Sequence, residues 1–144
     1  MILGIKKSIV LERSIFQVKL AMRAVLQVPM LLMWYKFLMI NIMEFTVAVS
    51  KDPKSKWYIG QCVEVQGALS QGRSVDELME NMKDAIELVV DYKNGSENGK
   101  SSMHSIYVNS NNGKFVTIPD HSDINDYLAN AICDMLGIPR CCEN

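Results

Sequence analysis

The chain has 144 residues, of which 49% are hydrophobic and 22% are charged, a balance that excludes an intrinsically disordered protein. Its net charge of −1 hides an asymmetry, because residues 1–43 carry a net +5 and residues 44–144 a net −6. This acidic body argues against unaided binding to a phosphate backbone, which needs clustered lysine and arginine, and it favours a basic partner.

Residues 1–42 are interpreted as a basic, apolar N-terminal extension. The run "AVLQVPMLLMWYKFLMINIM" contains Lys36, whereas a spanning helix needs about 20 consecutive apolar residues. Three interpretations remain open: a membrane-lying arm through residues 15–43, a packed or swapped helix, or an extension that does not belong to the domain. The last is favoured because a complete domain pattern begins at Met43.

Three short strands are predicted after this point. Phe45, Val47 and Val49 recur at every second position, which is the period of a half-buried strand. The β-branched and aromatic stretch "WYIGQCVEV" predicts a second strand, and "GALSQG" predicts a short third one. The turn sequence "SKDPKSK" between the first two makes them an antiparallel hairpin.

A capped amphipathic helix is predicted next, ending near Tyr92. Ser74 and Glu77 match a capping box, in which both side chains accept hydrogen bonds from backbone N–H groups of the first turn. The apolar stripe comprises Val75, Leu78, Met79, Met82, Ala85, Ile86, Val89 and Val90. This order of elements predicts a small antiparallel sheet with one helix on it, in a domain spanning residues 43–93.

A linker at residues 94–102 precedes a predicted strand–strand–helix unit at residues 103–140. "HSIYVNS" and "KFVTIPDH" flank the turn signal "NNG", and the helix is expected to start at Ser122–Asp123 and to stop at Gly137. The apolar face of that helix comprises Ile124, Tyr127, Leu128, Ala131, Ile132 and Met135. Because about 40 residues bury no self-sufficient core, we expect this unit to pack against another surface. The chain is therefore assigned to the α+β class.

The four cysteines predict free thiols. Cys62 lies in a predicted strand and Cys133 on a predicted helix, where a small buried thiol is usual, whereas Cys141 and Cys142 lie in a tail expected to fray. No Cys-x-x-Cys or Cys/His ligand spacing occurs, so neither a metal nor another cofactor is expected. These features favour a reducing, cytoplasmic compartment.

The residues of the first domain resemble the HicB family of antitoxins from toxin–antitoxin modules. The matching stretches are "MEFTVAVSKD", "WYIGQCVEVQGALSQG" and "RSVDELMENMKDAIELVV". The resemblance implies a partial RNase-H-like fold without nuclease activity. It also implies a homodimer with no small-molecule substrate, which binds a small basic toxin, covers its active site and blocks mRNA cleavage.

The solvent side of the first predicted helix is acidic, which suits a basic partner. Candidate toxin-binding residues are Asp76, Glu80, Asp84, Glu87 and Asp91. Such a row of carboxylates would steer a cationic protein, although a merely solvated helix face gives the same pattern. The edge of the sheet is a second candidate surface, because unpaired backbone groups can accept a partner's strand.

Residues 104–140 resemble the C-terminal half of HicA, the mRNA-cleaving toxin of the same modules. The resemblance puts the catalytic histidine at His104 and a second histidine, His121, at the end of the following strand. Ser102 and Met103 replace the usual Gly and Ser, the family's first helix and strand are missing, and the final helix has no lysine or arginine. Without basic contacts to RNA, His104 is expected to be an inactive remnant of a general base, and His121 a turn or cap residue.

These observations give one main hypothesis and three rivals. The chain is predicted to be a non-enzymatic antitoxin of a type II stress-response module, which neutralises a HicA-like toxin and carries a truncated, inactive toxin-like tail. The rivals are a self-inhibited fusion that cleaves RNA with His104, a DNA-binding autoregulator of its own operon, and a protein attached to a membrane. No helix-turn-helix is evident for the second rival.

Overall fold

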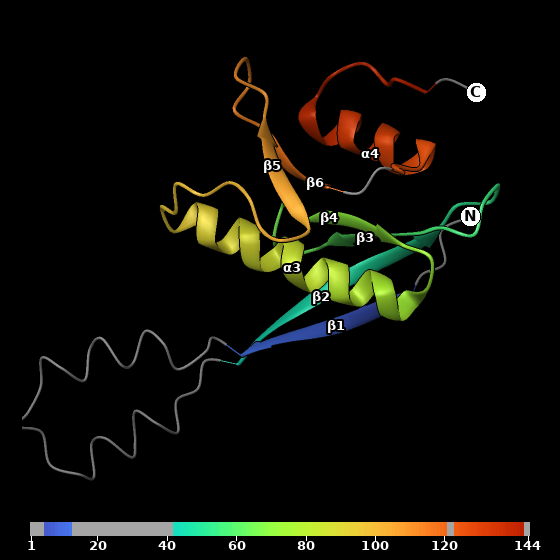
Figure 1. Ribbon diagram of the computed structural model, residues 1–144, viewed down its shortest axis with the longest axis horizontal. Coiled ribbons are helices and arrows are strands. Elements are labelled where there is room, and N and C mark those ends of the chain that lie inside the picture. Colours follow the sequence, from blue (N-terminus) through green and yellow to red (C-terminus); the bar gives the residue numbers. More distant parts are fainter. Residues whose placement is uncertain (1–4, 13–41, 121–122, 143–144) are drawn as a thin grey trace, which may run out of the picture. The chain divides into compact units, whose positions relative to one another are not determined.

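Figure 1 shows a computed structural model of the chain, which describes residues 5–12, 42–120 and 123–142. The elements are β1 (Ile5–Glu12), β2 (Ile42–Lys51), β3 (Tyr58–Cys62), β4 (Leu69–Gly72), α3 (Val75–Lys93), β5 (His104–Val108), β6 (Phe115–Pro119) and α4 (Asp126–Leu136). The first four strands form one sheet and β5 and β6 form a second, two-stranded one. The predicted α+β class is therefore confirmed.

The larger sheet has the order β1-β2-β3-β4. β3 pairs antiparallel with both neighbours, with Gly60 opposite Val49 on one side and Ser70 on the other. The segment expected to be an N-terminal extension thus supplies a strand, β1, while residues 13–41 lie outside the described part of the chain. Among the described helices, none has the length and apolar character needed to cross a membrane.

Helix α3 begins with the predicted capping box. Ser74 accepts a hydrogen bond from the Glu77 N–H at 3.1 Å, and the Glu77 carboxylate accepts one from the Arg73 N–H at 2.9 Å. The helix packs closely on β3 at Gly60, where an added Cβ would lie 3.0 Å from Met82. The absence of a side chain at this position lets the helix approach the sheet.

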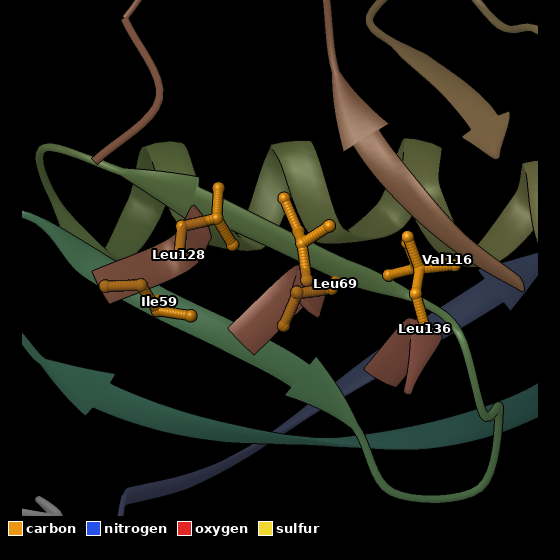
Figure 2. Packing of buried hydrophobic residues seen from close by; sticks show 6 residues of the cluster. Ile59, Leu69, Val116, Leu128 and Leu136 are labelled. Atoms are coloured by element: carbon orange, nitrogen blue, oxygen red, sulfur yellow. The ribbon is translucent and has the colours of Figure 1, made fainter. Parts of the chain in front are cut away.

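The opposite face of the sheet is covered by the C-terminal segment. Ile59 and Leu69, from β3 and β4, pack with Val116 of β6 and with Leu128 and Leu136 of α4 (Figure 2). Because neighbouring residues on a strand point to opposite faces, Ile59 and Gly60 mark the two sides of β3. The expectation that the last unit needs another surface to pack on is met within the chain itself.

Strand β6 is also joined to β4 by hydrogen bonds. The Thr117 hydroxyl donates to the Leu69 carbonyl at 2.7 Å and accepts from the Leu69 N–H at 2.9 Å. The Thr117 N–H donates to the carbonyl of Gly67 at 2.8 Å. Backbone groups at this edge of the sheet are therefore already bonded to the chain's own C-terminal segment.

Helix α4 starts later than predicted, at Asp126 instead of Ser122–Asp123. Asn125 is the N-cap: its side-chain oxygen accepts from the Tyr127 N–H at 2.8 Å, and its amide donates to Asp52 at 2.9 Å. A contact across 73 residues thus fixes the start of the helix.

The buried face of α4 differs in part from the prediction. Ile124 and Tyr127, expected on the apolar face, are 38% and 41% exposed. The buried residues of α4 are Leu128, Ile132, Cys133 and Leu136, and Gly137 ends the helix with a φ of 69°, as predicted.

Candidate functional site

The candidate site centres on His104, the first residue of β5, whose imidazole is completely buried. Its Nδ1 lies 2.8 Å from the Asp84 carboxylate on α3, and its Nε2 lies 2.9 Å from the Ser70 hydroxyl on β4. Ser70 is also fully buried, while 17% of the Asp84 side chain is exposed. One histidine thus ties the C-terminal segment to both the helix and the sheet of the first segment.

Two serines of the linker complete this arrangement. The Ser101 hydroxyl donates to Asp84 and accepts from the His104 N–H at 2.9 Å, and the Ser102 hydroxyl lies 3.4 Å from the same carboxylate. A buried polar group is costly unless it is hydrogen-bonded. Throughout the described part of the chain, every buried side-chain nitrogen and oxygen has a partner. The whole group is thus satisfied internally.

The structure separates the five candidate toxin-binding acids into two kinds. Asp76, Glu80, Glu87 and Asp91 are exposed on α3, as predicted for a solvent-facing row. Asp84 lies in the same row, but its carboxylate is engaged by His104 and the two linker serines. Asp84 therefore belongs to the contact between segments, and four carboxylates remain accessible to a partner.

The hydrogen-bond partners of His104 match those of a general base, but its ring is not exposed to a substrate. A carboxylate on Nδ1 and a hydroxyl on Nε2 is the order found in hydrolase triads. Catalysis also requires that the substrate comes within hydrogen-bond reach of the base. Ser70 and His104 are both 0% exposed, so the described conformation offers no such contact. His121 lies outside the described residues.

A second polar cluster holds the β2–β3 turn against the start of α4. Asp52 accepts hydrogen bonds from the Ser55 hydroxyl, the Lys54 N–H and the Asn125 amide, and the first two are the main reasons why its pKa is lowered. A pocket of about 280 Å³ opens beside it. It is lined by Asp52, Pro53, Lys54, Ser55, Asn125, Asp126, Tyr127 and Asn130.

The described residues hold no group of three His, Cys, Asp or Glu side chains placed to bind a metal ion. Cys62 and Cys133 are buried and free, and Cys141 is exposed, as the sequence predicts. Burial raises the pKa of Cys62, and the backbone N–H groups of Val65 and Glu64 oppose that rise.

Sequence reasoning missed Ser70 and the cluster around Asp52. The spacing of Asp52 and Ser55 is a local turn signal that could have been read from the sequence. No local signal joins Ser70 to His104, because 34 residues separate them.

Comparison with known proteins gives relatives for part of the chain. A UPF0150 protein of Archaeoglobus fulgidus is 36% identical over 58 residues, which are 40% of this chain and 83% of that protein. The chain belongs to the UPF0150 family. Another UPF0150 protein, from Synechocystis sp., is 37% identical over 51 residues, 35% of this chain and 72% of the relative. A third, from Thermotoga maritima, is 36% identical over 47 residues, 33% of this chain and 63% of the relative.

No protein-family model matches the chain. No solved structure matches it either. The Archaeoglobus fulgidus relative matches 40% of the chain.

Proposed function

We propose that this UPF0150 protein is the antitoxin of a type II toxin–antitoxin module, which binds and neutralises a small basic mRNA-cleaving toxin. The observation that carries the proposal is the row of four exposed carboxylates on α3: Asp76, Glu80, Glu87 and Asp91. The resemblance of the same segment to HicB antitoxins names the class of partner. UPF0150 membership is compatible with that class but names no partner of its own.

The packing of α3 supports a fixed orientation for this acidic row. Leu78, Met82 and Ala85 of the helix are buried, so the acids lie on the side that faces solvent. Residues three and four apart on a helix are neighbours, so Asp76 lies beside Glu80 and Glu87 lies beside Asp91. The exposed Lys83 and the engaged Asp84 lie between the two pairs. Acidic pairs on one helix face attract a cationic protein and raise its association rate at low salt.

We further propose that the C-terminal segment is an inactive toxin-like unit with a structural role. His104 stands where the resemblance to HicA puts the catalytic base, and it is enclosed by Asp84 and Ser70. Its burial supports a role in holding the two segments together. The edge of β4 is bonded to β6, so the acidic helix face is favoured over that edge as the surface for a partner in trans.

Growth rescue tests the antitoxin proposal. A full-length HicA-type toxin from the same organism is induced with the complete chain, with the double variant Glu80→Lys and Glu87→Lys, or with the control Glu97→Lys. Glu97 is an exposed acid of the linker, so the control changes a charge away from α3. We expect rescue by the native chain and the control, and loss of rescue with the double variant. A soluble native chain that gives no rescue would overturn the proposal.

An RNA-cleavage assay tests whether His104 is a catalytic base or an inactive residue. The purified chain is expected to leave a single-stranded RNA intact, and its His104→Ala variant to behave in the same way. Cleavage that disappears in His104→Ala would instead establish a self-inhibited ribonuclease.

A further inference from the structure

The last described residues fold back along α4 as a strap, residues 138–142. The guanidinium of Arg140 donates two hydrogen bonds to Asp134, at 3.0 and 2.7 Å. Two bonds join Cys142 to Asn130: the Asn130 amide donates to the Cys142 carbonyl at 2.7 Å, and the Cys142 N–H donates back at 3.1 Å. Arg140 and Cys142 thus contact positions earlier on the helix, contrary to the frayed tail expected from the sequence.

This path gathers three thiols at one place on α4. Cys133, on the helix, is 6% exposed; its thiol donates toward the Cys141 sulfur and accepts from the Cys141 N–H. The sulfur atoms of Cys141 and Cys142 are 3.4 Å apart, and the Cys142 thiol lies 3.7 Å from the Asp126 carboxylate. A buried thiol and an exposed thiol are therefore in contact across the strap.

We propose that Cys133 and Cys141 form a redox site that takes a low-molecular-weight disulfide of the glutathione type and closes a disulfide bond between strap and helix. The alternative pair, Cys141 and Cys142, is disfavoured by covalent geometry. Consecutive Cα atoms lie about 3.8 Å apart across a trans peptide. Disulfide-bonded residues usually have Cα atoms about 4.4–6.8 Å apart.

The exchange runs in two balanced steps. Cys141, which is exposed, loses its proton and attacks one sulfur of the external disulfide, forming a mixed disulfide and releasing one thiolate. Cys133 then loses its proton and attacks the sulfur of Cys141, which releases the second thiolate. The two cysteines are oxidised, the external disulfide is reduced, and the two protons end on the two released thiols.

The surroundings of the other two thiols set the order of these steps. Burial is the main reason why the pKa of Cys133 is raised, and the neighbouring thiol of Cys141 adds to it. The hydrogen bond with Cys141, followed by burial, raises the pKa of Cys142 to about 11. A raised pKa leaves less of the reactive thiolate at neutral pH. An external disulfide therefore meets Cys141 first, and Cys133 resolves the mixed disulfide from inside.

Peptide mapping of the oxidised full-length chain tests the site. The chain is incubated with oxidised glutathione and digested with trypsin, which cuts after Arg140 and so separates Cys133 from the peptide "CCEN". We expect "CCEN" to be joined to the peptide that contains Cys133, and reduction to separate the two. We also expect the linked form to melt at a higher temperature, because the bond closes a loop between strap and helix.

Three variants make the result decisive. Cys133→Ser should abolish the link, whereas Cys142→Ser and Cys62→Ser should retain it. A bond confined within "CCEN" would overturn the proposal. The proposal would also be overturned if Cys141 formed a mixed disulfide with glutathione that persisted both in the native chain and in Cys142→Ser.

Discussion

The two faces of the sheet are covered in different ways. On one face α3 follows β4 directly and packs through apolar side chains such as Leu78 and Met82. On the other face the C-terminal segment adds hydrogen bonds over long sequence separations to its apolar cluster, through Thr117 and Asn125. The same segment also reaches the α3 side of the sheet, where His104 bonds Ser70 and Asp84. Apolar packing tolerates many side chains, whereas a buried hydrogen bond needs one particular partner. The second face is therefore the more specific one, and also the more easily damaged by a single substitution.

The largest effect is expected from the apolar part of the second face. Leu69 is 1% exposed and contacts both β6 and α4, so Leu69→Ala leaves a cavity between the segments. We expect a loss of about 2–5 kcal/mol in the free energy of unfolding, measured in urea. Val63→Ala is the control, since Val63 is 61% exposed, and it should change little. A small effect of Leu69→Ala would mean that the C-terminal segment does not pack on β4.

The next effect should come from the histidine contact. Asp84→Asn keeps the shape of the side chain and removes the charge that His104 and Ser101 face. We expect a loss of roughly 1–3 kcal/mol in unfolding free energy, because the buried imidazole of His104 loses its charged hydrogen-bond partner. Glu87→Gln makes the same chemical change at an exposed position of α3, and it should cost at most about 0.5 kcal/mol. Equal effects of the two variants would contradict the account.

A smaller effect is expected at Thr117. Thr117→Val preserves the shape and removes the hydroxyl that bonds to both backbone groups of Leu69. We expect a loss of about 1–2 kcal/mol, since two buried backbone groups lose their side-chain partner. Thr117→Ser retains the hydroxyl and should lose less than the valine variant. A valine variant as stable as the native chain would show that this edge contact is dispensable.

The smallest effect concerns acid stability. Hydrogen bonds from Ser55 and from the Lys54 N–H lower the pKa of Asp52 from its ordinary value of 3.8. A lowered folded-state pKa contributes stability above the unfolded value, and that stability is lost as the pH falls through the folded value. Asp52→Asn should therefore flatten the decline of melting temperature below about pH 4, whereas Asp123→Asn, an exposed control, should not. An unchanged decline in Asp52→Asn would contradict this assignment.

The difference between the faces also explains which features could be predicted from the sequence and which could not. The alternation of Phe45, Val47 and Val49 and the capping box at Ser74 are local signals, and each element they predict is present. The hairpin turn at "NNG" and the stop at Gly137 are equally local, and both were predicted correctly.

The contacts between segments had no local signal. The start of α4 was placed wrongly because Asn125 is selected as the cap by a bond to Asp52 in a distant turn. Asp84 looked like one more solvent-facing acid, and only the fold brings His104 to it. Sequence periodicity identifies which face of an element is buried, but it does not say which polar residue of another segment will meet it there.

Amide hydrogen exchange at Thr117 tests the central claim, that the C-terminal segment is docked on β4. Its N–H donates to the Gly67 carbonyl and so forms a backbone contact between the two segments. If the segments form one cooperative unit, this amide exchanges only through global unfolding, with the same free energy of opening as the core amide of Val89 in α3. Rapid exchange at Thr117 beside slow exchange at Val89 would show that the segment leaves the sheet on its own, and would contradict the account.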